Sequence, residues 1–193
     1  MADEPEIRAR AHGTLRRAYQ HLGLFEPAEK HARAALILMR QLHGADDPAT
    51  ARSEFALGDV LSDRYQPAAA EPLLRHALAV QRRQPLPDHA ALAETLETLS
   101  FIYSAQTKPL LAEPLAQEAL AQARIAWGEQ DERSLRLLNE MGTIKIGKQD
   151  FTAAETIFRR LILPADHPPP CGPATPPPQP TRRILTFPVC QFP

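Results

Sequence analysis

Apolar residues recur along most of this chain at steps of three and four, which is the spacing of one face of an α-helix. The pattern predicts eight helices, at residues 3–22, 25–43, 48–64, 67–84, 88–106, 109–127, 131–147 and 150–163. Asp47 and Asp88 stand before two of them as N-caps, and Gly44 and Gly128 follow two others where a helix should end. The sequence therefore predicts an all-α fold.

The predicted helices belong to a repeat of 42 residues. The dipeptide Ala-Glu occurs four times at this spacing, beginning at Ala28, Ala70, Ala112 and Ala154. A large aliphatic residue stands at one fixed distance before each pair: Leu15, Leu57, Leu99 and Met141. One copy is a pair of helices, and such a hairpin cannot bury its apolar face alone. We therefore expect an α-solenoid of about four antiparallel hairpins (3–44, 45–86, 87–128 and 129–163), with these four residues at matching interior positions.

This pattern resembles the tetratricopeptide repeat, in which the first helix carries a large, a small and an aromatic residue. The large position is the aliphatic column above, and Gly58, Ser100, Gly142, Tyr19 and Tyr103 match the small and aromatic positions, whereas Arg16, Leu61 and Lys145 depart from them. The 42-residue period is similar to the longer repeats of kinesin light chains, and the texture is similar to tetratricopeptide regions of bacterial serine/threonine kinases. The resemblance implies a right-handed solenoid and a non-catalytic scaffold whose concave groove binds a protein or peptide segment.

The repeat frame also predicts which side chains line the concave groove. They stand on the first helix of each hairpin, at positions outside the core: Arg10, Arg17, Arg52, Phe55, Asp59, Phe101, Arg136 and Asn139. Arginine forks suit carboxylates, so the partner is expected to be acidic, and the two phenylalanines could seat an apolar anchor. The alternative is that each arginine pairs with Asp or Glu of the same face, which contributes only about 0–1 kcal/mol per exposed pair.

Composition changes the picture in two places. Eleven of the 20 prolines lie in residues 164–193, and because proline lacks the amide donor, this segment is expected to be a disordered tail. The 22 basic and 23 acidic residues nearly balance, which argues against nucleic acid or a membrane surface as partner. Only two cysteines occur and no apolar run approaches the ~20 residues of a membrane span, so we expect a cytoplasmic protein.

Signals for catalysis are weak. The 7 histidines and 2 cysteines have no metal-ligand spacing, no glycine-rich phosphate loop occurs, and no Ser-His-Asp arrangement stands out. His12 and Glu54 hold equivalent repeat positions, which suggests structural neighbours rather than a catalytic pair. We therefore expect no enzyme activity, no cofactor and no metal. The alternative function is that of a regulatory or interaction fragment of a larger signalling enzyme.

The last helix poses a separate problem. Phe151, Ile157, Phe158 and Ile162 cannot all face the one preceding helix, so part of this apolar surface is expected to be exposed. The tail could cover it, a second chain could cover it through self-association, or the chain could be a truncated or frame-altered end of a longer array.

Overall fold

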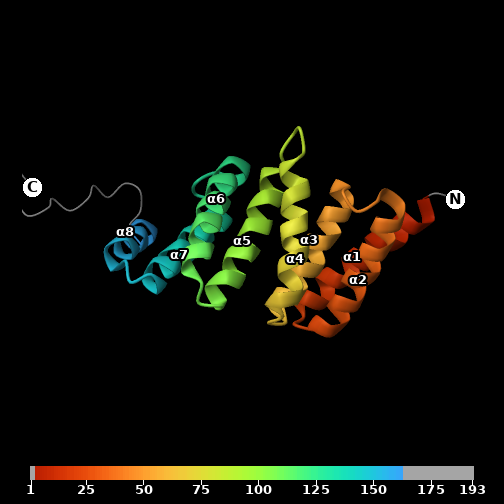
Figure 1. Cartoon of the computed structure of the whole chain (residues 1–193), viewed down its shortest axis with the longest axis horizontal. Coiled ribbons are helices and arrows are strands. Elements are labelled where there is room, and N and C mark those ends of the chain that lie inside the picture. The colour runs from red at the N-terminus through yellow and green to blue at the C-terminus, as the bar shows by residue number, and fades with distance from the viewer. Residues whose placement is uncertain (1–2, 163–193) are drawn as a thin grey trace, which may run out of the picture. The chain divides into compact units, whose positions relative to one another are not determined.

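The computed structural model describes residues 3–162, and all of its regular elements are helices. They are α1 (Asp3–His21), α2 (Phe25–His43), α3 (Pro48–Asp63), α4 (Pro67–Arg82), α5 (His89–Ala105), α6 (Pro109–Trp127), α7 (Glu132–Gly147) and α8 (Phe151–Ile162). Each bound lies within two residues of the prediction. Figure 1 shows the helices following one another along a row, and each packs mainly on its neighbours in sequence. The tail predicted at 164–193 lies outside the described residues.

The helix starts and stops follow from local chemistry. The carboxylates of Asp47, Asp88 and Asp131 accept backbone N–H groups of the first turns of α3, α5 and α7, at 2.7, 3.1 and 3.0 Å. Gly44 and Gly128 end α2 and α6 with φ of 87° and 94°, which glycine adopts without steric cost. The predicted caps are therefore confirmed.

The turn inside each hairpin also repeats, although its sequence does not. Residues 23, 65, 107 and 149, spaced by the repeat period, all have positive φ, of 71°, 56°, 56° and 62°. In each turn the next amide donates to the carbonyl five residues earlier, at 2.9 Å, as Leu24 does to Tyr19. Only the first turn has a glycine, so the left-handed residues Tyr65, Thr107 and Gln149 could not be recognised from composition.

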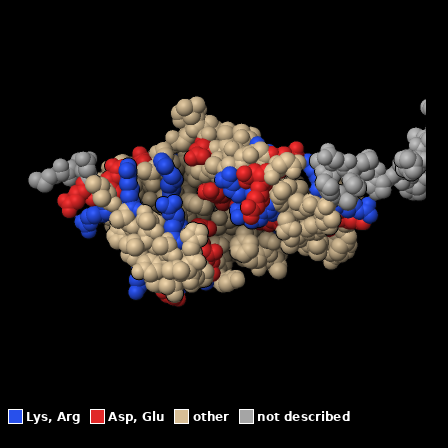
Figure 2. Space-filling view, turned by 180° about the vertical axis from the view of Figure 1, so that it is seen from behind, with Lys and Arg blue, Asp and Glu red and all other residues tan. Residues whose placement is uncertain are grey.

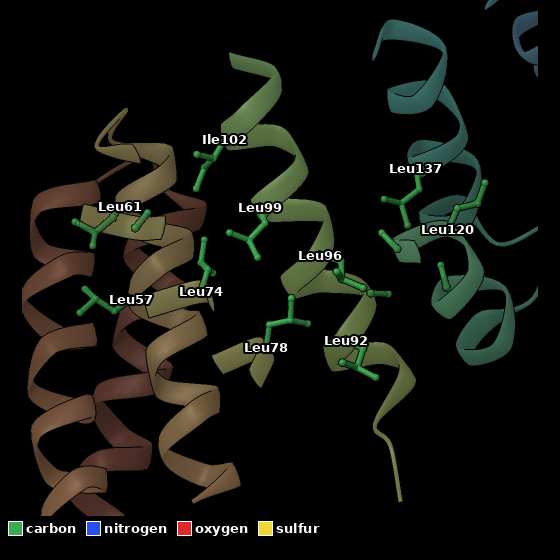
Figure 3. Close-up of a cluster of buried hydrophobic side chains, with 14 of the residues drawn as sticks. Leu57, Leu61, Leu74, Leu78, Leu92, Leu96, Leu99, Ile102, Leu120 and Leu137 are labelled. Carbon is green, nitrogen blue, oxygen red and sulfur yellow. The ribbon is translucent and has the colours of Figure 1, made fainter. Parts of the chain in front are cut away.

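A continuous leucine-rich core joins the hairpins. Leu57, Leu99 and Leu74 are 5%, 1% and 0% exposed and belong to one cluster that reaches from α2 to α7. Figure 3 shows the side chains of this cluster between α3, α4 and α5 and between α6 and α7. The predicted interior column is confirmed at Leu57 and Leu99, and Met141 is half-buried against the same cluster. It is wrong at Leu15, which is 43% exposed because no helix precedes α1 in the described structure.

Within a hairpin, a large side chain of the second helix fits against a small residue of the first. A Cβ added to Gly58 would lie 2.7 Å from Cγ of Leu74, and one added to Gly142 would lie 2.5 Å from Cζ of Phe158. In the first hairpin the sizes are exchanged, since Arg16 stands opposite Ala32, and in the third hairpin both residues are small, Ser100 and Ala116. The hairpin thus needs one small residue in each pair, on either helix.

We expect Gly58→Ala to lower the free energy of unfolding. The new methyl group would overlap fully buried Leu74, and overpacking costs about 1–3 kcal/mol. The matched control is Gly13→Ala, where nothing lies within 4 Å of the added carbon. That change should raise stability by about 0.5–1 kcal/mol, because alanine is the better helix former. Urea unfolding followed by circular dichroism measures both, and a stabilised Gly58→Ala protein would contradict the packing described here.

Candidate functional site

A cleft of about 630 Å³ opens between α1, α2 and α3. Ala32, Ala35 and Met39 of α2 are buried and form its floor. Gly13 of α1 and Ala56 of α3 contribute to its walls, where larger residues would fill the space. The cleft therefore exists because α1, α2 and α3 all carry small residues on the sides that face it.

Arginines surround this cleft. Its lining includes Arg10, Arg16, Arg17 and Arg52, with Glu6 as the acidic member. Arg10 pairs with Glu6 at 2.8 Å, but Arg17 and Arg52 are exposed and have neither an ion pair nor a side-chain hydrogen bond with any residue of α1–α8. The structure thus brings together three of the predicted groove residues around one apolar-floored hollow. On the face shown in Figure 2, basic side chains gather over the N-terminal helices, and acidic and basic side chains intermingle farther along.

Arg16 connects the cleft to an acidic pair on α3. Its Nη1 donates to Gln20 at 2.6 Å, and Gln20 Nε2 donates to Asp59 at 2.8 Å and to Asp63 at 2.6 Å. Its Nε is buried without a hydrogen-bond partner, and burial lowers the pKa of Arg16. Burial, and next the charge of Asp63, raise the pKa of Asp59 against the effect of the Gln20 hydrogen bond. Asp59 therefore links α3 to α1 through its hydrogen bond with Gln20, and it does not line the cleft.

The other predicted groove residues lie elsewhere. Arg136 makes a bidentate pair with Glu97, at 2.9 and 3.0 Å, so this guanidinium is already occupied by its own surface. Phe55 is half-buried against the core clusters and is not a free anchor. Phe101 is 48% exposed and lines a separate hollow of about 140 Å³ beside the end of α5, and Asn139 is exposed on α7. This cleft is therefore lined by three of the eight residues, and a partner groove that uses all eight stays a prediction.

Sequence reasoning missed Arg16 and the apolar floor of this cleft. Arg16 stood out only as a departure from the repeat pattern, and the floor of α2 carried no signal because alanines are common throughout the chain. Farther along, the concave surface is acidic. Burial, followed by the charges of Asp59 and Glu97, raises the pKa of Glu94. The concave positions thus change from basic on α1 to acidic on α5, where Glu94 and Glu97 lie.

Glu140 is the most perturbed member of the acidic part. Ser100 Oγ donates to its carboxylate at 2.8 Å, but burial outweighs this bond and, with the charge of Glu97, raises the pKa of Glu140 to about 7. The carboxyl group is therefore held protonated in part near neutral pH, between α5 and α7.

No catalytic arrangement emerges among the described residues. Glu54 is 1% exposed and pairs with Arg40 at 2.6 Å and His76 at 2.5 Å, whereas His12 contacts His31 at 2.8 Å. The two residues that seemed equivalent in sequence therefore have different partners. Within residues 3–162, no group of His, Cys, Asp or Glu is arranged to hold a metal ion. None of the described helices combines the length and apolar character that crossing a membrane requires.

The raised pKa of Glu140 predicts a pH-dependent stability. The unfolded carboxyl titrates near 4.5 and the folded one near 7, so between these values the unfolded state loses its proton first. The free energy of unfolding should therefore fall as pH rises through this window and level off above it. In Glu140→Gln this loss, on the order of 1–3 kcal/mol, should disappear. Urea unfolding at about pH 4 and about pH 8 measures the difference, with exposed Glu4→Gln as the control; equal pH slopes in all three proteins would refute the assignment.

Comparisons with known proteins agree with this architecture. A family model described as tetratricopeptide repeat matches residues 8–83 and 66–125, and no curated protein sequence matches the chain. Two solved structures of a kinesin-light-chain-like protein with nearly identical TPR-like repeats, from Podosopora anserina, align with TM-scores of 0.70 and 0.72 at 18% and 19% identity. They cover 80% and 86% of this chain and 73% and 81% of theirs.

A third solved structure, BtubC (BKLC) from P. vanneervenii, aligns with a TM-score of 0.72 at 17% identity, covering 98% of this chain and 73% of its own. Identities this low show the fold alone, which is the predicted α-solenoid of helical hairpins. The similarity to bacterial kinase regions stays a prediction. Because the family model spans more than half of the sequence, the chain belongs to the tetratricopeptide repeat family.

Proposed function

We propose that this chain is a non-catalytic scaffold that binds an acidic protein segment in the cleft between α1, α2 and α3. Tetratricopeptide repeats generally bind protein partners through the surfaces that their stacked helices create. The observation that carries the proposal is the position of Arg17 and Arg52, two exposed guanidinium groups without partners in α1–α8, above an alanine floor. Guanidinium forks bind carboxylates with two parallel hydrogen bonds, and an apolar floor accepts an aliphatic side chain.

The acidic part of the concave surface supports a direction for the bound segment. Burial raises the pKa of both Asp59 and Glu94, and the nearby charge of Glu97 adds to it in both, so the local field of these three carboxylates is negative. If the bound segment were acidic along its whole length, the part that passes over α5 would be repelled by the carboxylates there. We therefore propose a short acidic stretch at the cleft, followed by neutral or basic residues over α5 and α7.

The compartment belongs to the same proposal. A cytoplasmic scaffold is consistent with a chain that carries two cysteines, both within its last 23 residues.

Peptide binding tests the site. We would measure fluorescence anisotropy with labelled peptides of equal length, one series acidic with a central leucine and one series basic. The acidic series should bind more tightly, and its affinity should fall as salt is raised. Arg17→Gln combined with Arg52→Gln should weaken binding by about tenfold or more, because two charge-assisted contacts are lost.

The matched control is Arg83→Gln combined with Arg124→Gln, which removes the same charge from exposed positions directly after α4 and on α6, outside the cleft. It should bind the acidic peptides as the unaltered chain does. Equal weakening by both pairs would indicate a general charge effect, and unchanged binding in the Arg17 and Arg52 protein would remove the cleft from the proposal.

A further inference from the structure

The contacts between consecutive hairpins show what a hairpin end requires. We call the contact between the second helix of one hairpin and the first helix of the next a joint. At the joint of α4 with α5, Leu78, Leu99 and Ile102 are 6%, 1% and 2% exposed. The Tyr103 hydroxyl donates a hydrogen bond to Glu71 at 2.8 Å, while Arg75 donates one to the Tyr103 oxygen at 2.6 Å. The joint therefore has an apolar part and a Glu-Arg-Tyr hydrogen-bonded part.

The other joints are built in the same way. Leu36 and Leu120, equivalent to Leu78, are 5% and 6% exposed. The glutamate equivalent to Glu71 pairs across each joint, Glu29 with Arg64 and Glu113 with Lys145 at 2.6 Å. A glutamate on the second helix of one hairpin that meets a polar group on the first helix of the next hairpin, or directly after it, is thus a constant feature.

Both ends of the row expose one half of such a joint. On α1, Leu15 is 43% exposed and Ala18 is exposed, although Val60, equivalent to Ala18, is completely buried. On α8, Ile162 is 77% exposed, although it holds the position of Leu36, Leu78 and Leu120. Each end thus presents side chains that are buried wherever the repeat continues.

The two exposed halves match each other residue by residue. Two repeat periods separate the members of α8 from their equivalents on α4: Glu155, Arg159 and Ile162 correspond to Glu71, Arg75 and Leu78. The same shift relates α1 to α5: Leu15, Ala18 and Tyr19 correspond to Leu99, Ile102 and Tyr103.

The polar groups at the two ends already have the arrangement that this contact requires. Glu155 and Arg159 already pair at 2.7 Å, as Glu71 and Arg75 pair at 3.1 Å. The ring of Tyr19 stacks on His31, and its hydroxyl has no hydrogen-bond partner within α1–α8. The three groups of the Glu-Arg-Tyr cluster are therefore present, but divided between the two ends of the row.

We propose that α8 of one chain docks on α1 of a second copy, in the arrangement that α4 has on α5. In this contact Ile162 covers Leu15 and Ala18, and Glu155 accepts a hydrogen bond from the hydroxyl group of Tyr19. The two surfaces differ, so the association is head-to-tail and each added copy exposes a new end. It uses neither Arg17 nor Arg52 and is independent of the peptide-binding proposal.

Sedimentation velocity of the full chain over micromolar to millimolar concentrations tests this contact. The average mass should rise with concentration. Leu15→Lys and Ile162→Lys should each weaken self-association by more than about tenfold, because the contact would bury an unpaired ammonium group. Both side chains are exposed in the single chain, so circular dichroism should show unchanged helix content. Ile125→Lys, at a position 63% exposed on α6 and outside both half-joints, is the control and should associate as the unaltered chain does.

Mixing the two variants distinguishes the head-to-tail contact from a symmetric one. Leu15→Lys keeps an intact α8 and Ile162→Lys keeps an intact α1, so their equimolar mixture should form a dimer that neither forms alone. Tyr19→Phe should weaken association about threefold to tenfold, because one hydrogen bond to a carboxylate is lost. A mass independent of concentration in the unaltered chain would overturn the proposal, as would full association of either lysine variant by itself or no dimer in the mixture.

Discussion

Burial of leucine between consecutive hairpins is the constraint on which the rest of this structure depends. A two-helix hairpin has an apolar face on each side and too little interior to cover either. Leu74, Leu96, Leu99 and Leu137 are almost completely buried only because a neighbouring helix lies over each of them. Full burial of one such side chain contributes about 1.5–3 kcal/mol, so the joints supply much of the stability of the row. A structure of this kind is stabilised by its nearest-neighbour contacts, one joint at a time.

This dependence explains why the concave surface is free to vary. Positions on the first helix of a hairpin that point away from the joints lie mostly outside the core, so Gly13, Glu97 and Asn139 can share one repeat position with the half-buried Phe55 without disturbing the stack. The inner packing is stricter, but it requires a small residue in each pair rather than one fixed residue, since that residue is Ala32 on the second helix of one hairpin and Gly58 on the first helix of the next. The cleft between α1, α2 and α3 arises where small residues occupy both a concave position, Gly13, and an inner position, Ala32.

Electrostatics then divides the concave surface. Arg17 and Arg52, which have no ion pair within α1–α8, lie on α1 and α3, whereas burial, and next the charge of neighbouring carboxylates, raises the pKa of Glu94 on α5 and of Glu140 on α7. Half-buried Glu140 receives one side-chain hydrogen bond, from Ser100, which offsets only part of the cost of burying its charge. In the proposed function, this uneven charge lets the surface distinguish partners by the order of charges along them, which a uniformly charged groove could not do.

The sequence by itself determined the family, the eight helices and most of their ends, because periodicity, N-cap aspartates and C-terminal glycines are local signals. It also located the column of Leu57 and Leu99, since a repeat of fixed length transfers an interior position from copy to copy. Only the tertiary structure decided which copies lack a neighbour, and so why Leu15 and Ile162 are exposed despite their register. It alone decided that Arg136 is taken up by Glu97 while Arg17 and Arg52 are not, because the partner of a surface charge depends on distances across helices that a one-dimensional pattern does not contain.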